Sequence, residues 1–242
     1  MNPIADTDAD NINVQLPLGL SLSDSARFES FYSGPNREVK QALRRCAEGS
    51  EQGPVFIWGA RGTGKTHLLQ AVCREAGERG QAVGYLPLDR NGEFSPALLE
   101  GLESLAVVCV DDIQAIAGLR EWEEAVFHLF NRLQQRGVVF IAAADCPPSD
   151  LGVKLDDLAS RLGWGLVYPI QPVDDQARLE LLQLRARERG LDLPAETGRF
   201  LLSRYPRDLP TLCELLDRLD HASLVAQRRL TIPFVKDVLD KQ

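Results

Sequence analysis

The stretch that decides the fold is Val55-Phe56-Ile57-Trp58-Gly59-Ala60-Arg61-Gly62-Thr63-Gly64-Lys65-Thr66. It begins as a short apolar run typical of a buried strand, and Gly59–Thr66 then matches G-x-x-x-x-G-K-[ST]. The glycines let the backbone wrap a phosphate with its N–H groups pointing inward, and Lys65 would reach the β- and γ-phosphates. The alternative is a glycine-rich strand–helix turn that happens to contain Lys-Thr. Pattern and context together favour a phosphate-binding loop, in which the Thr66 hydroxyl binds Mg²⁺.

A second apolar run, Leu105–Val110, ends in the carboxylate pair Asp111-Asp112. Taken alone, such an ending is a solvated turn, but its place one strand–helix–strand unit after the loop favours a metal site. Asp111 is expected to hold Mg²⁺ through water. Asp112 stands where many ATPases carry a glutamate that polarises the attacking water. Aspartate is one methylene shorter, and this difference weighs against hydrolysis of its own ATP by the chain.

Strand and helix signals alternate outward from these motifs. Alternation of this kind predicts a parallel sheet with helices on both faces. After residue 170 the strand signal stops. We therefore expect a flexible tail over residues 1–22, an α/β nucleotide-binding core over 23–170 and a small all-α domain over 171–242. Strands are expected at 55–58, 82–88, 106–110, 138–144 and 166–170; helices at 36–47, about 65–78, 96–104, 121–136, 174–189, 194–205, 209–227 and 231–240.

Composition narrows the function classes. The 242 residues carry a formal net charge of −8, which argues against a protein that binds nucleic acid by phosphate neutralisation alone. The five cysteines show no C-x-x-C spacing and the three histidines are far apart, so no zinc site is indicated. No apolar run approaches the ~20 residues of a membrane span. The acidic N-terminus excludes a secretory or transit signal, and we expect a cytoplasmic protein.

Three segments carry a more specific resemblance: GTGKTHLLQAV at 62–72, VDDIQ at 110–114 and SRLGWGL at 160–166. They resemble the AAA+ module of the bacterial replication initiator DnaA. The chain ends where the initiator would begin its C-terminal DNA-binding helices. With the tail segment QLPLGL, it is similar to the DnaA-related regulators that inactivate the initiator after replication starts. The resemblance implies an AAA+ P-loop NTPase core followed by a helical lid.

The resemblance also assigns roles. Arg161 occupies the arginine-finger position, which reaches into a neighbouring subunit's nucleotide site; otherwise it would be a surface helix arginine. Asp157 stands where the DnaA branch often has a second arginine. Asp145 matches the first sensor, the alternative being a strand-end turn, and Arg207 matches the second. Phe28, Phe31, Tyr32 and Asn36 resemble the linker that covers the base, with core packing as the alternative for both phenylalanines. Thus the catalytic candidates are Arg161, Asp112 and Asp145, and the cofactor-binding candidates are Gly59, Ala60, Arg61, Gly62, Thr63, Gly64, Lys65, Thr66, His67, Tyr32 and Arg207.

The N-terminal tail contains Gln15-Leu16-Pro17-Leu18-Gly19-Leu20, which resembles the short peptides that bind the bacterial sliding clamp. In such peptides a glutamine amide bonds inside a pocket while leucines fill an apolar groove, and a proline lowers the ordering cost. The alternative is that the leucines pack on the protein's own core. The expected clamp-binding residues are Gln15, Leu16, Leu18 and Leu20.

These observations predict a negative regulator of replication initiation. Its expected ligand is ADP, with ATP or another nucleoside diphosphate left open, together with Mg²⁺. The expected partners are DnaA and the sliding clamp, with DNA reached only through the clamp; a homodimer that hides Arg161 or the tail is left open. One rival is a self-assembling AAA+ ATPase, helicase- or clamp-loader-like, that hydrolyses its own ATP. Another is a scaffold in which the nucleotide is only structural.

Overall fold

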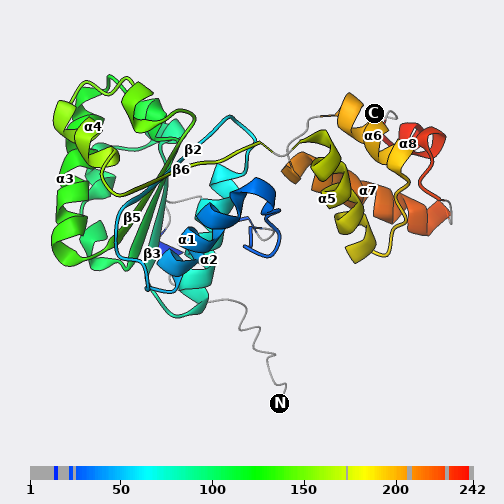
Figure 1. Cartoon of the computed structure of the whole chain (residues 1–242), viewed down its shortest axis with the longest axis horizontal. Helices are drawn as coiled ribbons and strands as arrows, with labels where there is room; N and C mark the ends of the chain where they lie inside the picture. The colour runs from blue at the N-terminus through cyan, green and yellow to red at the C-terminus, as the bar shows by residue number, and fades with distance from the viewer. Residues whose placement is uncertain are drawn as a thin grey trace, which may run out of the picture. The chain divides into compact units, whose positions relative to one another are not determined.

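The computed structural model describes residues 14–15, 22–23, 26–172, 174–205, 209–226 and 229–239. The chain divides into two compact units: the first ends at Ile170 but leaves out Arg61–Thr63, and the second consists of Arg61–Thr63 and the residues from Gln171 onward. The first unit is built on a parallel sheet of order β1-β3-β4-β5-β2-β6 (Figure 1). Its strands are β1 (Val14–Gln15), β2 (Val55–Trp58), β3 (Val83–Pro87), β4 (Val107–Asp111), β5 (Val139–Ala144) and β6 (Leu166–Pro169).

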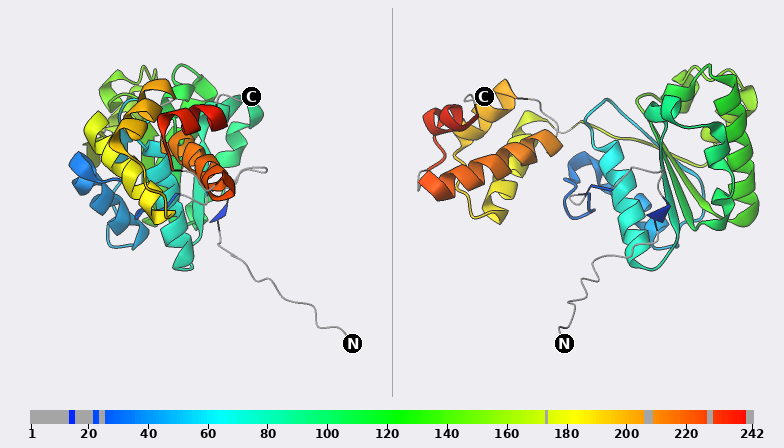
Figure 2. Two further views of the ribbon diagram at one scale, coloured as in Figure 1. Left: turned by 90° about the vertical axis from the view of Figure 1, so that its right-hand side faces the viewer. Right: turned by 180° about the vertical axis from the view of Figure 1, so that it is seen from behind.

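Helices cover both faces of this sheet (Figure 2). The α1 helix (Arg37–Ala47) and α2 (Lys65–Glu78) pack on one face, and α3 (Arg120–Arg136) and α4 (Asp156–Leu162) on the other. Successive strand residues alternate between the two faces, as the pleat requires. Ile57 and Ile141 therefore enter the α2 core, whereas Phe56 and Phe140 enter the α3 core. The expected α/β core of parallel strands and flanking helices is confirmed.

Several elements differ from the sequence prediction. The helix expected at 96–104 is two short 3₁₀ turns, η3 (Pro96–Leu99) and η4 (Leu102–Ser104), because the left-handed Gly101 separates them. Apart from 3₁₀ turns, two elements of the described chain were not predicted: the two-residue strand β1, which pairs with β3, and the short helix α4. The remaining 3₁₀ turns are η1 (Gly34–Asn36), η2 (Leu88–Glu93), η5 (Ile113–Ile116) and η6 (Pro148–Asp150).

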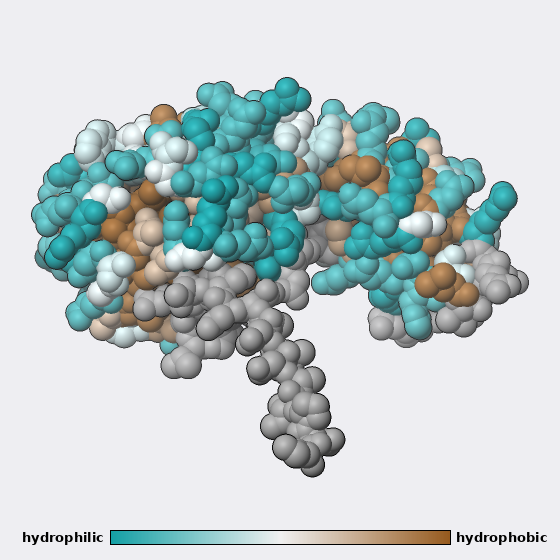
Figure 3. All heavy atoms as spheres, turned by 90° about the horizontal axis from the view of Figure 1, so that it is seen from below, coloured by the Kyte–Doolittle hydropathy of each residue, from teal (hydrophilic) through white to brown (hydrophobic). Residues whose placement is uncertain are grey.

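The second unit is all helical, as expected. It contains α5 (Asp175–Glu188), α6 (Ala195–Arg204), α7 (Leu209–Ala226) and α8 (Ile232–Leu239). Asp174 caps α5 by accepting a hydrogen bond from the backbone N–H of Ala177 at 2.7 Å. A leucine-rich core, which includes Leu182, Leu212 and Leu216, joins the four helices. Charged and polar side chains cover most of the described surface in the view of Figure 3, and no helix of the described chain is long and apolar enough to cross a membrane.

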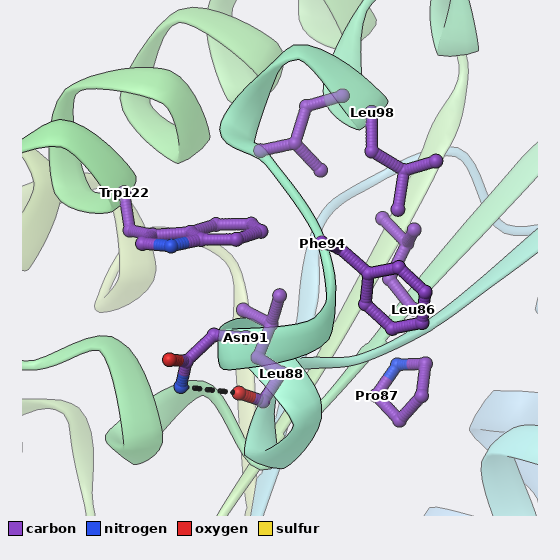
Figure 4. Close-up of a pocket in the computed structure, with 8 residues that line it drawn as sticks. Leu86, Pro87, Leu88, Asn91, Phe94, Leu98 and Trp122 are labelled. Carbon is purple, nitrogen blue, oxygen red and sulfur yellow. Dashed lines mark hydrogen bonds between the residues drawn. The ribbon is translucent and has the colours of Figure 1, made fainter. Parts of the chain in front are cut away.

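A small apolar pocket lies on the α3 side of the sheet, under η2 and η3 (Figure 4). Phe94 and Trp122 contribute rings to its lining, and the Asn91 amide donates to the Leu88 carbonyl at 2.8 Å. Its volume of about 10 Å³ holds little more than one water molecule. This pocket is therefore too small for a nucleotide, and the candidate site lies elsewhere.

Candidate functional site

The three strands that carry the predicted nucleotide residues end at one edge of the sheet. Strand β5 lies between β2 and β4, and all three run parallel. The register aligns Trp58, the last residue of β2, with Ala144, the last residue of β5. The phosphate loop, Asp111 and Asp145 follow from these strand ends, so the carboxyl edge brings them together. In open parallel sheets ligands bind at this edge.

Lys65 opens α2 and bends back over its own loop. Its Nζ donates hydrogen bonds to the carbonyl oxygens of Gly59 (2.7 Å) and Ala60 (3.2 Å). Only 7% of Lys65 is exposed, and this burial lowers its pKa, while the negative charges of Asp112, Asp111 and Asp145 oppose the shift. The three aspartates predicted from the sequence therefore lie close enough to act on the predicted lysine. A cation held inside the loop suits the binding of phosphate oxygens.

Asp111 is buried beside Thr66, the other predicted magnesium residue. Only 2% of Asp111 is exposed, and burial raises its pKa, whereas hydrogen bonds from Thr66 and Tyr85 lower it. The Tyr85 hydroxyl donates to Oδ2 of Asp111 at 2.8 Å. A hydroxyl and a carboxylate side by side are hard oxygen donors that suit Mg²⁺, which commonly takes its other ligands from substrate phosphates and water. The residues present therefore fit a magnesium–nucleotide complex.

Tyr85 was missed by the sequence analysis. It stands in β3, and the register places it opposite Cys109, two residues before Asp111. The signal was the strand pairing itself, because neighbouring parallel strands bring residues of equal register together. Burial and the Asp111 carboxylate both raise the pKa of Tyr85, so it remains a hydrogen-bond donor at physiological pH.

Asp112 adopts a left-handed backbone conformation with φ of +52°, rare for a residue other than glycine. Its carboxylate oxygen Oδ1 accepts a hydrogen bond from the Gln114 amide at 2.8 Å. Gln114 therefore holds the side chain that the sequence analysis proposed as a base. Among the residues with described positions, no three His, Cys, Asp or Glu side chains form a metal-binding group. This absence leaves the Thr66 and Asp111 pair unaffected, since Mg²⁺ needs few protein ligands in such sites.

The linker of residues 26–36 packs against the loop. Phe28 and Phe31 are both buried in the α2 core, so core packing describes the two phenylalanines. Gly64, with φ of +95°, approaches Phe31 so closely that an added Cβ would lie 2.8 Å from the ring. Tyr32 is half-buried against Gly34, and Asn36 is buried. Phe31 thus packs directly against Gly64 of the phosphate loop.

His67 was expected among the cofactor-binding residues, but its side chain turns to this linker. Its Nε2 lies 2.9 Å from the Arg27 carbonyl oxygen and 3.1 Å from the Ser30 hydroxyl. The Phe31 ring centroid is 6.1 Å from the histidine ring. The His67 ring therefore contacts the linker. This long-range contact could not be predicted from the loop motif.

Arg161 lies in the last turn of α4, at the opposite edge of the sheet. The chain leaves α4 through Gly163–Gly165, and Leu166 then donates its N–H to the Pro54 carbonyl at 3.1 Å. Because β6 starts beside the start of β2, this segment lies at the amino edge. The phosphate loop lies beyond the other end of β2, at least a strand length of ~10 Å away. Within one chain, the two predicted functional elements therefore occupy opposite edges.

The guanidinium of Arg161 is exposed. It lies 5.7 Å from the centroid of the Trp164 ring, a cation–π contact, and Trp164 itself is 55% exposed. Within the described part of the chain Arg161 has neither an ion pair nor a hydrogen-bond acceptor for its side chain. Arg207, Leu16, Leu18 and Leu20 lie outside the described residues, and Gln15 is described only through its backbone in β1.

Comparisons with known proteins agree with this geometry. Residues 22–169 match the family model of the bacterial DnaA ATPase domain, and residues 175–239 match that of the Hda lid domain. Domain III of the Thermotoga maritima initiator DnaA is similar with a TM-score of 0.73 and 24% identity, covering 91% of this chain and 98% of that one. AMPPCP-bound DnaA from Aquifex aeolicus has a TM-score of 0.70 and 30% identity, covering 84% and 67%. The Thermotoga maritima RuvB motor shares the fold at 16% identity and a TM-score of 0.64, covering 87% and 69%.

A parallel sheet with a phosphate loop after β2, a carboxylate at the end of β4 and a separate helical lid defines an AAA+ nucleotide-binding protein. The chain belongs to the family of the bacterial DnaA ATPase domain. Its lid further identifies it as an Hda-like AAA+ protein related to DnaA.

Proposed function

We propose that this chain is a negative regulator of bacterial replication initiation, acting in the cytoplasm by stimulating ATP hydrolysis on DnaA. In this proposal it binds a nucleotide and Mg²⁺ at its own carboxyl edge and supplies Arg161 to the nucleotide site of DnaA. An arginine placed on the transition-state charge of a phosphoryl transfer contributes ~10³–10⁵ in rate in well-studied hydrolases. The match to the Hda lid and the DnaA ATPase domain supports a regulator related to the initiator.

The observation that carries this proposal is the position of Arg161. The arginine lies at the amino edge of the sheet, while its own phosphate loop lies beyond the carboxyl edge. A guanidinium placed there cannot serve the nucleotide of its own chain, but it is exposed to another molecule. Its position at an exposed helix end supports action in trans.

The nucleotide of this chain then has a structural role. Lys65 and the backbone of Gly59–Thr66 would hold the phosphates, and Thr66 with Asp111 would hold Mg²⁺. Bound Mg²⁺ supplies charge neutralisation between phosphate oxygens. The working ligand in our proposal is ADP, because Asp112 is a short base whose carboxylate is already hydrogen-bonded by Gln114. Asp145 would face the phosphates at the same edge, and Arg207 would approach them from the lid.

The sliding clamp is the second proposed partner. The tail residues Gln15, Leu16, Leu18 and Leu20 would dock on it as an extended peptide, for which Gln15 would leave its pairing with β3. Docking would bring Arg161 to DnaA on the same DNA. The net charge of −8 supports contact with DNA only through the clamp. Tethering of this kind raises the effective concentration of the arginine without a large direct interface.

The test is a reconstituted assay with ATP-bound DnaA, DNA-loaded clamp and this chain. Arg161→Ala should lower the stimulated hydrolysis at least ~100-fold, because the missing cation acts in the transition state. Arg120→Ala, which removes an arginine with an 89% exposed side chain on the same unit, should leave the rate unchanged. Full stimulation by the Arg161→Ala chain would refute the mechanism.

Two further measurements complete this assay. Deleting residues 15–20 should abolish the clamp dependence and leave nucleotide binding intact; clamp binding that survives the deletion contradicts the tail assignment. The rival function is a self-assembling ATPase that hydrolyses its own ATP. This rival function predicts that the isolated chain hydrolyses ATP at a rate comparable with that of the stimulated DnaA reaction.

A further inference from the structure

Glu123 is a buried carboxylate that the proposed reaction does not use directly. It lies in the first turn of α3 and is 1% exposed. Burying a charge is costly unless hydrogen bonds compensate it. Oε1 accepts from the backbone N–H of Gly118 (2.6 Å) and of Lys154 (3.0 Å), and Oε2 accepts from Lys154 (3.0 Å) and Leu155 (2.9 Å). Three backbone amides therefore converge on one side chain. One comes from Gly118, five residues earlier in the chain, and two come from residues 154–155, about thirty residues later.

Two of these amides stand directly before the arginine-bearing helix. Helix α4 begins at Asp156, and Leu155, its N-cap residue, makes no capping hydrogen bond with its own side chain. A helix of seven residues is too short to be stable by itself and depends on tertiary contacts. Leu158 and Leu162 bury one face of α4 in the α3 core. Glu123, which lies outside α4, binds the backbone at its N-terminal end.

The other end of α4 rests on the same partner helix. Trp164 follows α4 and lies 6.4 Å, ring to ring, from Phe130 of α3, while the Arg161 guanidinium lies over the Trp164 ring. Glu123 and Phe130 are two helical turns apart on α3, a rise of about 10 Å, which matches the length of the seven-residue α4. Helices α3 and α4 also lie side by side in Figure 1 and pack together. Helix α3 thus supports α4 at both ends.

We propose that Glu123 is a positioning residue for Arg161: its carboxylate fixes the start of α4 and thereby the direction in which the arginine leaves the surface. This inference rests on the proposed role of Arg161 in trans. A group that acts on transition-state charge must be placed closely, since a 1 Å displacement can cost ~100-fold in rate. Loss of the anchor should therefore lower the rate at saturation more than the affinity for the partner.

The test compares Glu123→Gln with the matched variant Glu124→Gln. Glutamine has nearly the same shape, but its amide nitrogen meets backbone N–H groups and cannot accept from them. Glu124 is the next residue along α3, is 47% exposed in its side chain and, among the residues that the structure describes, pairs with Arg120 at the surface. Glu123→Gln should lower the maximal stimulated rate about 10- to 100-fold while the concentration for half-maximal effect and nucleotide binding stay within twofold. Glu124→Gln should behave as wild type.

Amide hydrogen exchange gives a readout independent of DnaA. In Glu123→Gln the amides of residues 154–162 should exchange at least tenfold faster, while those of α2 and β2 keep their protection. Unchanged exchange at 154–162, or uniform acceleration across the whole core, would overturn the positioning role. So would faster exchange with an unchanged maximal rate, provided that Arg161→Ala lowers that rate. If Arg161→Ala has no effect, the proposed function fails, and the exchange data still decide whether Glu123 holds α4.

If Glu123→Gln does not fold, a milder variant still tests the proposal. Glu123→Asp keeps the buried charge but shortens the reach by one methylene, so it should loosen 154–162 and lower the maximal rate by a smaller factor. A folded Glu123→Asp chain with wild-type exchange and a wild-type rate would contradict the proposal.

Discussion

The two edges of the same sheet are built in different ways. The carboxyl edge takes its phosphate loop from one contiguous segment, Gly59–Thr66, and adds Asp111 at the end of β4 and the residues that directly follow β4 and β5. The position of Arg161 at the amino edge depends on contacts between distant segments: Glu123 with Lys154 at the start of α4, and Pro54 with Leu166 at the start of β6. The comparison teaches that a binding loop is encoded locally, whereas the direction of an exposed arginine is encoded by the packing around its helix.

The edges also differ in electrostatics. At the carboxyl edge Lys65 and Asp111 are buried, and burial shifts the pKa of the first downward and of the second upward. At the amino edge Arg161 is an exposed cation over an exposed aromatic ring. In our proposal, one edge holds a ligand inside the chain and the other presents a charge to a partner.

The largest effect that should separate the edges comes from Gly165→Ala. Gly165 has φ of +109°, and an added Cβ would lie 2.3 Å from the Pro54 carbonyl oxygen. Backbone strain of this kind costs ~1–3 kcal/mol, and the contact with backbone adds to it. We expect thermal unfolding of the core to begin roughly 5–10 °C earlier, together with a loss of DnaA stimulation.

The matched control is Gly163→Ala, two residues earlier in the same loop. An added Cβ there meets its nearest atoms at 3.7 Å, ordinary van der Waals contact. Its unfolding midpoint should stay within about 2 °C of wild type, as for a substitution that meets no strain. Equal destabilisation by both variants would show that the amino edge does not depend on the close approach to Pro54.

The local encoding of the carboxyl edge explains why most of it could be predicted. The loop pattern gave Lys65 and Thr66, and the end of an apolar strand gave Asp111, because motif spacing and strand patterning are properties of neighbouring residues. The five main strands were predicted for the same reason, since each is an apolar run between turn signals. The pattern could not predict the strand order, in which β5 lies between β2 and β4.

The features that were missed all depend on long-range contacts. Tyr85 on β3 contacts Asp111 on the neighbouring strand β4, and the His67 ring contacts the linker some forty residues earlier in the chain. Helix α4 was missed because a seven-residue helix has too little periodicity, and its stability comes from Glu123 and the α3 core. Strand β1 is only two residues long and has no pattern of its own.

A second, smaller effect should be confined to the carboxyl edge. Lys65→Ala removes the charged donor that we propose binds the phosphates, a loss of ~1.5–3 kcal/mol, or about 10- to 100-fold in nucleotide affinity. Arg61→Ala, which removes an exposed cation from the same loop, should weaken binding by no more than about threefold. Calorimetric titration with ADP and Mg²⁺ measures both. Equal losses would mean that general positive charge, and not the buried lysine, binds the phosphates.

The smallest effect tests the buried carboxylate by pH. Burial raises the pKa of Asp111 in the folded chain. An acid whose pKa is higher in the folded chain than in the unfolded chain binds more protons when folded. Below the unfolded pKa both states are protonated, and the group does not lower the free energy of unfolding. As the pH rises through the folded pKa, the buried group must ionise, and the free energy of unfolding falls. Asparagine does not titrate. The unfolding midpoint of Asp111→Asn relative to wild type should therefore rise between pH 4 and pH 7, without nucleotide or Mg²⁺.

The slope with pH, and not the absolute midpoint, is the informative quantity. Asparagine also loses one of the hydrogen bonds that Asp111 accepts from Thr66 and Tyr85, but this loss is the same at every pH and only offsets the curve. We expect a relative gain of ~1 kcal/mol, about 2–4 °C for a chain of this size. A relative midpoint of Asp111→Asn that falls from pH 4 to pH 7 would mean that the hydrogen bonds and Lys65 outweigh burial, and that the carboxyl edge is preorganised for a charged Asp111 even before a metal binds.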